Sequence, residues 1–405
     1  MFRAIVLAIV QVFTIHIENQ AARGRMITYD SVSKIYGSGP GAVTALDNVS
    51  FHIEKGEVVV FLGPSGCGKT TTLRLTNRLD SITRGTITIG GRDINEQDPV
   101  RLRQSMGYVI QEIGLFPNKT IAQNIAVVPR MLGWSKDKIS ERTDELLRMV
   151  QLDPALYRDR YPAELSGGQQ QRIGVARGLA ADPEILLMDE PFGAIDPINR
   201  EQIQDEFLKV QEKLKKTIAF VSHDIHEAIK MGDKIALFSE GRLIQYDTPE
   251  MILTQPKNKF VADFVGSDRA LKVLGLMRVR DAMNPVPLNI IQGDTLAPAA
   301  IGFLEEKKRR YGVVVDGGKP VGFVSLKDLK FETGPVRDVA TPFPVMAQGR
   351  QPLRDALSMM LMHDLILLCV IDGNGDFIGT VSYQNIQRAI LDVYSDETED
   401  RDVTR

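Results

Sequence analysis

Gly63-Pro-Ser-Gly-Cys-Gly-Lys69-Thr70 is the stretch that decides the fold of this 405-residue chain. It matches the pattern G-x-x-x-x-G-K-[ST] and stands between an apolar, strand-like run at 57–62 and a helical pattern at 70–79. Glycines let the backbone wrap closely around an anion and aim its N–H groups at phosphate oxygens. The stretch therefore predicts a phosphate-binding loop between a strand and a helix. An ordinary glycine turn is the alternative.

Side chains of this loop carry the predicted chemistry. Lys69 is placed to reach the β- and γ-phosphates of ATP, and Thr70 to ligate Mg²⁺. The N-terminus of the following helix adds positive potential. The ATP-binding residues expected here are Gly63, Pro64, Ser65, Gly66, Cys67, Gly68, Lys69, Thr70 and Thr71.

A second part of the site is predicted at Ile185-Leu-Leu-Met-Asp189-Glu190. The apolar run indicates a buried strand, and Asp189 at its end would hold Mg²⁺ directly or through water. Glu190 is placed to polarise the attacking water as a general base. Two acids after a strand are also typical of a solvated strand end, so the phosphate loop upstream favours the catalytic interpretation.

Strand-like and helical patterns alternate from residue 165 onward. Short apolar or β-branched runs occur at 184–188, 217–221 and 234–238. This alternation predicts a mainly parallel sheet covered by helices, whereas residues 113–163 are expected to be mostly helical.

Leu165-Ser-Gly-Gly-Gln169, which ends 20 residues before Asp189 and is followed by Gln-Gln-Arg172, resembles the signature motif of ABC ATPases. The resemblance covers residues 27–265 and implies further roles for single residues. Tyr36 would stack on adenine, Gln111 would sense Mg²⁺, Asp196 would belong to the D-loop, and His223 would be the switch histidine at the γ-phosphate. Tyr36 as a packing aromatic and His223 as a structural histidine are the alternatives.

The ABC resemblance implies a fold and a mechanism. The expected fold is α/β, a P-loop ABC ATPase domain with a RecA-like core and a helical subdomain. Two copies would close head to tail on two ATP molecules, and each would cover the other's γ-phosphate with its signature residues, which are Ser166, Gly167, Gly168 and Gln169. Hydrolysis would use Glu190, His223 and Lys69.

Several segments resemble the ATPases of quaternary-amine importers more narrowly, among them 72–79, 107–117, 124–129 and 191–200. The resemblance implies a subunit that energises import of glycine betaine, carnitine or choline. Its expected partners are a second copy of the chain, an integral-membrane permease and, indirectly, a substrate-binding protein. The subunit would lie on the cytoplasmic face of the membrane and be held there by the permease.

An internal repeat with an offset of 57 occupies residues 279–382. Val279-Arg-Asp281 recurs as Val336-Arg-Asp338, Leu296 and Ala299 as Leu353 and Ala356, and Gly322 and Ser325 as Gly379 and Ser382. Each copy resembles a CBS motif, so the resemblance implies a tandem α+β CBS pair. Ser325 and Asp328 resemble the ribose-contacting turn of nucleotide-binding pairs, while Asn385 replaces the acid in the second copy. A purely structural dimerisation module is the alternative to one nucleotide site.

The expected domains are an N-terminal extension at 1–25, an ATPase domain at 26–265, a linker at 266–278, two CBS repeats at 279–332 and 333–391, and an acidic tail at 392–405. The extension contains the apolar run Ala4-Ile-Val-Leu-Ala-Ile-Val10, and Met26 favours a misassigned start. No stretch reaches the roughly 18–20 apolar residues that span a bilayer. Residues 395–405 lack an apolar face and are expected to be disordered.

Composition narrows the function classes. The net charge of -3 argues against a nucleic-acid binder, which is usually basic. The two cysteines, Cys67 and Cys369, have no metal-type spacing and fit a reducing cytoplasm. Three alternatives stay open: an importer of another small solute such as an amino acid, a soluble non-transport ABC ATPase, and a regulatory protein with a vestigial cassette.

Overall fold

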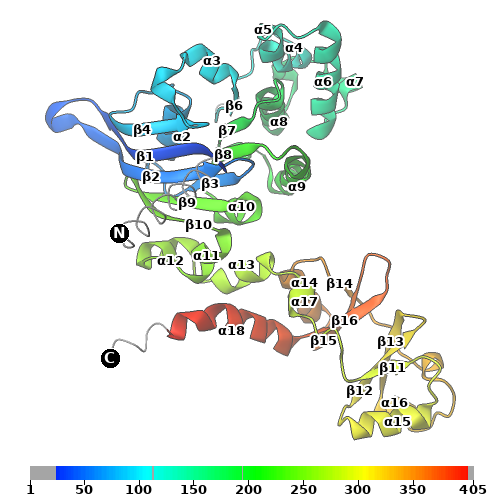
Figure 1. Cartoon of the computed structure of the whole chain (residues 1–405). Helices are drawn as coiled ribbons and strands as arrows, with labels where there is room; N and C mark the ends of the chain where they lie inside the picture. Colours follow the sequence, from blue (N-terminus) through cyan, green and yellow to red (C-terminus); the bar gives the residue numbers. More distant parts are fainter. Residues whose placement is uncertain (1–23, 112–113, 194, 400–405) are drawn as a thin grey trace, which may run out of the picture. The chain divides into compact units, whose positions relative to one another are not determined.

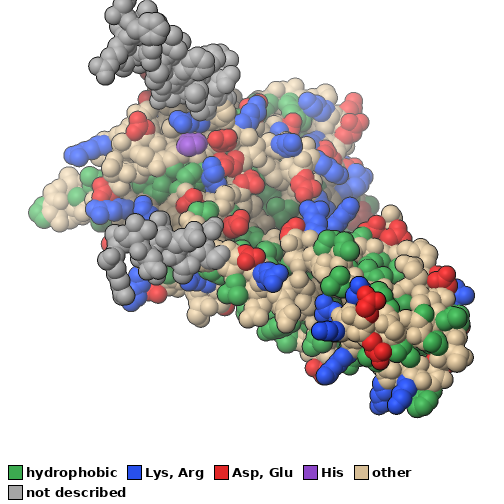
Figure 2. Space-filling view, turned by 60° about the horizontal axis from the view of Figure 1, so that its bottom comes forward, with side chains coloured by type: hydrophobic (Ala, Val, Ile, Leu, Met, Phe, Trp, Pro, Cys, Tyr) green, Lys and Arg blue, Asp and Glu red, His purple; other side chains and the backbone are tan. Residues whose placement is uncertain are grey.

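The computed structural model describes residues 24–111, 114–193 and 195–399 and divides the chain into two compact units. The first comprises Met1–Ile252 with Pro256–Phe264, and the second Leu253–Gln255 with Val265–Arg405. Of the predicted extension at 1–25, residues 1–23 lie outside the described chain. Charged side chains of both signs are interspersed over the face drawn in Figure 2.

A six-stranded sheet forms the centre of the first unit, in the order β10-β9-β3-β8-β7-β6 (Figure 1). All neighbours run parallel except β10 and β9, which confirms the predicted, mainly parallel sheet. Every residue of β3, β7 and β8, three of the four inner strands, is buried, as expected for a sheet covered on both faces. The strands are β3 (Val58–Leu62), β6 (Met106–Val109), β7 (Ile185–Asp189), β8 (Thr217–Val221), β9 (Lys234–Ser239) and β10 (Arg242–Asp247).

A four-stranded antiparallel sheet, which the sequence patterns did not separate from the first, packs on the same core. Its order is β2-β1-β4-β5, from β1 (Arg25–Tyr36), β2 (Val43–Glu54), β4 (Arg84–Ile89) and β5 (Arg92–Asp93). The rings of Tyr29 and Phe51 stack at 4.3 Å, and Phe51 meets Phe61 and Phe238 edge-on. These aromatic contacts join the two sheets.

The segment predicted to be helical at 113–163 contains four helices in its described part. α6 carries Ile139, Thr143, Leu146 and Leu147 on its buried face, at helical spacing, and Ser135 caps its first turn. The helices are α4 (Ile121–Ile125), α5 (Val127–Met131), α6 (Lys136–Met149) and α7 (Pro154–Tyr157).

The other helices of the first unit flank the strands and follow them in sequence. Two of them, α2 and α8, begin inside segments of the predicted ATP site, at Lys69 and Gly167, and α9 begins directly after Asp196. They are α2 (Lys69–Thr76), α3 (Pro99–Gln104), α8 (Gly167–Leu179), α9 (Pro197–Leu214), α10 (Ile225–Met231), α11 (Pro249–Thr254) and α12 (Lys259–Val265).

The second unit repeats one small motif twice. Each copy has three strands, two paired in parallel and two in an antiparallel hairpin, and a hydrophobic core of its own. The strands are β11 (Ile290–Gln292), β12 (Tyr311–Asp316), β13 (Lys319–Ser325), β14 (Ala347–Gln348), β15 (Leu367–Ile371) and β16 (Phe377–Ser382). The helices are α13 (Arg269–Leu276), α14 (Val279–Ala282), α15 (Ala297–Glu306), α16 (Leu326–Leu329), α17 (Leu353–Met362) and α18 (Tyr383–Glu399).

The single repeat offset of 57 is wrong for the middle of each copy. Val314 pairs with Ile291 as Val370 pairs with Ala347, and α15 begins 56 residues before α17. The offset returns to 57 after the hairpins, because the hairpin of the first copy is one residue shorter. Two residues separate Asp316 from Lys319, whereas three separate the corresponding Asp372 and Asp376. Leu296, which is 55% exposed, is therefore no counterpart of the fully buried Leu353.

The expectation of a disordered tail from residue 395 is also wrong in part, because α18 continues to Glu399. The apolar side chains Ile386 and Ala389 anchor the helix in the core of the second copy. Adding residues to an established helix avoids the cost of nucleation, so the helix extends past its apolar face. Residues 400–405 lie outside the described chain. No helix in the described ranges is both long and apolar enough to cross a membrane.

Candidate functional site

The phosphate loop connects β3 to α2, as the sequence predicts, and two of its glycines are required by close contacts. Gly63 has a φ of 144°, and a Cβ there would lie 2.2 Å from the Phe238 carbonyl oxygen. Gly68 has a φ of 106°, and its Cβ would lie 2.5 Å from the Ala45 carbonyl oxygen. Any larger residue at either position would displace the backbone of the loop.

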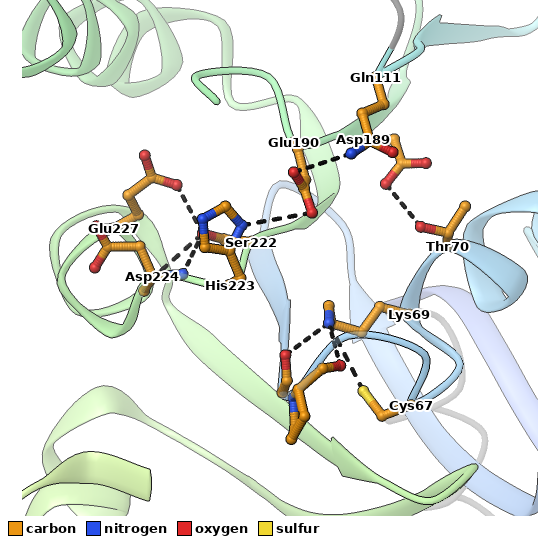
Figure 3. Close-up of polar contacts among 12 residues, drawn as sticks. Cys67, Lys69, Thr70, Gln111, Asp189, Glu190, Ser222, His223, Asp224 and Glu227 are labelled. Carbon is orange, nitrogen blue, oxygen red and sulfur yellow. Dashed lines mark hydrogen bonds and ion pairs between the residues drawn. The ribbon is translucent and has the colours of Figure 1, made fainter. Parts of the chain in front are cut away.

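Lys69 lies folded over this loop (Figure 3). Its Nζ donates to the Gly63 and Pro64 carbonyl oxygens at 2.6 and 2.8 Å, and its side chain is 6% exposed. Phosphate oxygens could replace these carbonyls as acceptors. Nζ also lies 3.7 Å from Cys67 Sγ, and burial raises the pKa of that thiol, which keeps it protonated at neutral pH.

Thr70 and Asp189, the predicted Mg²⁺ ligands from α2 and β7, lie together. Thr70 Oγ1 donates to Asp189 Oδ1 at 3.0 Å, and burial raises the pKa of Asp189. Two ligands at about 2.1 Å on adjacent corners of an octahedron are themselves about 3 Å apart, so the pair fits Mg²⁺. The described residues contain no group of three or more His, Cys, Asp and Glu side chains suited to a metal.

The carboxylate of Glu190 lies between two polar side chains from separate loops (Figure 3). Gln111 Nε2 donates to Glu190 Oε2 at 3.1 Å, and His223 Nδ1 lies 3.5 Å from Oε1. The carbonyl of Glu190 accepts from Gln171 Nε2 at 2.8 Å, and its N–H donates to Val221 at 3.2 Å. The structure thus brings together the predicted base, the predicted switch histidine and the glutamine.

The signature residues lie at the start of α8. The side-chain hydrogen bonds that they make within the described chain go to each other and to Tyr157, and none goes to the phosphate loop. Ser166 and Gln169 form a reciprocal capping box, and Gln169 Nε2 donates to the Tyr157 hydroxyl at 3.1 Å. Ser166 and Gly167 are exposed. The N-terminal N–H groups of α8 are thus accessible for a phosphate from another molecule.

Asp196 of the predicted D-loop caps α9. Its carboxylate accepts from the Asn199 N–H at 3.1 Å and from Asn199 Nδ2 at 2.8 Å, and these bonds hold its pKa below the usual range. Ala194 lies outside the described residues.

Tyr36 has a set of partners that the sequence did not predict. Its hydroxyl donates to Asp80 Oδ2 at 2.8 Å, and Arg74 Nε donates to the same oxygen at 2.7 Å. Lys34 Nζ lies 4.7 Å from the centre of the ring, within range of a cation–π contact. The residues are up to 46 positions apart in sequence, and no local pattern marks them.

Ser325 and Asp328 form a capping box at the start of α16, and Ser382 and Asn385 form the same arrangement at α18. The hydrogen bond from Ser325 lowers the pKa of Asp328. A hollow of about 470 Å³ lies beside Asn385, lined also by Asp281, Arg388 and Asp392. The hydrogen bonds between the Ser325 and Asp328 side chains therefore stay within the turn that starts α16.

Comparison with known proteins gives matches over both units. The family model of ABC transporters matches residues 46–193, and the CBS domain model matches 279–332 and 336–392. The chain is 47% identical to the osmoprotectant import ATP-binding protein OsmV of Salmonella typhimurium, over 89% of this chain and 95% of that protein. It is 43% identical to the glycine betaine/carnitine/choline transport ATP-binding protein OpuCA of Bacillus subtilis, over 92% and 98%.

A solved structure also matches the first half of the chain. It is the dimeric post-hydrolysis state of an ATP-binding cassette bound to ADP and Pi, with a TM-score of 0.52 and 34% identity, over 55% of this chain and 99% of that one. Together with the family matches, it confirms the predicted fold class, an ABC ATPase fold followed by a CBS pair.

Proposed function

This chain belongs to the ATP-binding subunits of ABC transporters, and from that premise we propose that it energises the import of a quaternary-amine compatible solute through a partner permease. The proposal takes the substrate class from the relatives, whose names include osmoprotectant, carnitine, choline and glycine betaine transport. The permease and the binding protein select the cargo, so the substrate class rests on resemblance rather than on a site in this chain.

The observation that carries the ATPase function is the position of Glu190 beside the Thr70–Asp189 pair. Mg²⁺, held by Thr70, Asp189 and Gln111, would neutralise phosphate charge. Lys69 would exchange its two carbonyl partners for phosphate oxygens. Glu190 would orient and deprotonate the attacking water, with Gln111 and His223 holding its carboxylate.

The same proposal assigns a partner to the signature residues. The exposed N-terminus of α8 would cover the γ-phosphate bound to a second copy, which gives a homodimer with two shared sites. The dimer would contact an integral-membrane permease on the cytoplasmic face, with a substrate-binding protein acting on the other side.

The domain boundaries and the ligand of the CBS pair belong to this proposal as well. The division into units near residues 252–265 and the matched CBS segments support an ATPase domain at 26–265 and repeats at 279–332 and 333–391. The segment proposed as a linker, 266–278, contains α13, and Leu274 of this helix packs in a core of the second unit. A nucleotide at Ser325 and Asp328 would bind the first repeat.

Uptake of labelled betaine, carnitine and choline in a deletion strain tests the function. We expect the wild-type gene to restore uptake, and Glu190→Gln not to, because the amide cannot take the proton of water; its ATPase rate should fall by about 10²–10⁴-fold. Glu184→Gln, at an exposed glutamate just before β7, is the matched control and should behave as wild type.

Three results would redirect the proposal. Restored uptake of an amino acid in place of the amines would change the cargo. ATP hydrolysis without any transport defect in the deletion strain would favour a soluble ATPase. Wild-type turnover by the Glu190→Gln protein would remove the assigned base.

A further inference from the structure

Glu227 is a buried carboxylate that none of the catalytic roles above uses. It lies in the first turn of α10 and is 8% exposed. Its two oxygens have separate partners: Ser222 Oγ donates to Oε2 at 2.7 Å, and Gln204 Nε2 donates to Oε1 at 3.2 Å. One carboxylate therefore joins the loop before α10 to helix α9. Figure 3 shows Glu227 beside Ser222.

Ser222 fixes the backbone on both sides of His223. Its N–H donates to the Phe61 carbonyl of β3 at 3.0 Å, and its hydroxyl accepts from the Asp224 N–H at 3.0 Å while donating to Glu227. The orientation of the hydroxyl, and with it the course of the chain at His223, therefore depends on the acceptor that Glu227 supplies.

Helix α9 connects the same carboxylate to the D-loop segment. Arg200 Nη2 donates to the Ile195 carbonyl oxygen at 2.9 Å, and Arg200 Nε lies 3.9 Å from Glu227 Oε1. This Nε is buried and has no hydrogen-bond partner within the described ranges. A movement of α9 toward α10 would bring this Nε within hydrogen-bond distance of the Glu227 carboxylate.

We infer that Glu227 is a positioning residue for ATP hydrolysis, which holds the His223 loop in register with the D-loop segment through Ser222 and Arg200. The inference rests on the proposed role of His223. If the side chain served packing alone, an uncharged residue would make the fold more stable, because burying a carboxylate costs free energy. Stabilising the first turn of α10 is the competing explanation, since an acidic residue there favours the helix dipole.

Single-turnover ATP hydrolysis and the KM for ATP of two Glu227 variants separate these explanations. Glu227→Met keeps the volume but removes both acceptors, and we expect the rate of hydrolysis to fall about tenfold with an unchanged KM. Glu227→Gln should recover most of the rate, because its amide oxygen can accept from Ser222 and the amide of Gln204 can rotate to accept from the new NH₂ group.

A double-mutant cycle with His223→Ala provides the decisive measurement. In that background Glu227→Met should cause no further loss of rate, because the group that it positions is absent. Ser222→Ala, which leaves the carboxylate in place, should reproduce the Glu227→Met effect and keeps the test valid if the Met variant does not fold. Glu57→Gln, at a carboxylate paired with Lys234 at 3.0 Å, is the control and should combine additively with His223→Ala.

The outcomes distinguish failure of the inference from failure of the proposed function. An equal loss of rate with and without His223, or a lower melting temperature with an unchanged rate, would overturn the positioning role. Wild-type hydrolysis by His223→Ala alone would instead overturn the catalytic assignment of the histidine.

Discussion

Glu190 shows how one residue can be fixed by its backbone. Its φ of 46° lies in the left-handed region, which a non-glycine residue seldom adopts. Strained backbone of this kind costs about 1–3 kcal/mol and persists only where the surroundings enforce it. Here the N–H and the carbonyl are both held, by Val221 and Gln171. The strain thus directs the carboxylate toward Gln111 and His223.

Asp80 is expected to control how well Tyr36 binds adenine. Asp80→Asn weakens the acceptor shared by Tyr36 and Arg74, so the ring should lose its fixed orientation. We expect the KM for ATP to rise about three- to tenfold with kcat unchanged, because binding and not chemistry is affected. The Arg74 hydrogen bond keeps the pKa of Asp80 below its usual range, so the effect should persist in mildly acidic buffer.

Tyr36→Phe and the double variant complete this test by ATPase kinetics. Phenylalanine can still stack but cannot reach Asp80, so adding Asp80→Asn to Tyr36→Phe should cause little further change. Asp47→Asn, at a carboxylate paired with Arg242 at 2.8 Å, is the control. A fall in kcat, or full additivity, would argue against the orienting role.

At the residue scale, the sequence could mark candidate residues only where local spacing identifies them. Lys69 and Thr70 lie in one loop, and Asp189 and Glu190 are adjacent, so a pattern could find them. The Tyr36–Asp80 and Ser222–Glu227 contacts join ordinary residues across loops and helices. Such contacts are set by packing, which a single sequence does not display.

Among the elements, the phosphate loop offers a sharp comparison between two glycines. Gly63→Ala would place a Cβ 2.2 Å from a backbone oxygen of β9, whereas Gly66→Ala would meet nothing within 4 Å. Both positions have a positive φ, but the φ of 78° at Gly66 lies near the left-handed region that other residues can adopt, whereas the φ of 144° at Gly63 does not, so backbone strain adds to the clash at Gly63. We expect Gly63→Ala to abolish binding of a fluorescent ATP analogue and Gly66→Ala to weaken it only modestly. Equal effects of the two variants on binding would contradict a special requirement for glycine at position 63.

Helix α10 should show a pH-dependent cost of burying Glu227. Burial raises the pKa of this carboxyl, with Arg200 and His223 opposing and Asp224 reinforcing the shift. The unfolded chain releases the proton near pH 4.3 and the folded chain only at higher pH. Wild type therefore loses stability as pH rises from about 4.3 through the raised pKa. Glu227→Met escapes that loss.

The melting temperature of Glu227→Met relative to wild type should accordingly increase from about pH 4.5 toward neutrality and then level off. Thermal denaturation across that range measures the difference. Glu212→Met, at an exposed glutamate of the same unit, should give a flat difference. A flat difference for the Glu227 variant as well would show that burial of its charge costs nothing.

Element prediction was accurate for buried strands and failed on the repeat. The runs at 184–188, 217–221 and 234–238 match β7, β8 and β9 within one residue, because strands buried on both faces are apolar throughout. The alignment of the two copies at a single offset failed because they differ in length at two places, once before β11 and once in the hairpin, and the two one-residue differences cancel. The Gly317-Gly318 hairpin is one residue shorter than its counterpart, so the flanking identities agree at 57 while the middle aligns at 56.

For the whole molecule, each of the two units has its own hydrophobic core. Nothing in the second unit contributes a side chain to the predicted hydrolytic residues, which all lie between 36 and 223. All residues to which the proposed hydrolysis assigns a role therefore belong to the first unit.

The exposed start of α8 allows a test of the assembly of two copies. If the exposed start of α8 completes the site of a second copy, two different inactive variants should rescue each other. Lys69→Ala disables the phosphate loop. Gly167→Asp places a negative charge where the γ-phosphate would bind, and its Cβ meets nothing within 4 Å, so the fold should be unaffected. Asp in the first turn even favours the helix.

In a heterodimer of these variants, both changes fall in one shared site and the other site is intact. Differently tagged copies, co-expressed and purified through both tags, should hydrolyse ATP at up to about half the wild-type rate, although each homodimer is inactive. Were the signature residues to act on the phosphate loop of their own chain, every site in the mixture would carry one lesion. Absence of any recovery would therefore exclude the shared site, and with it the head-to-tail dimer.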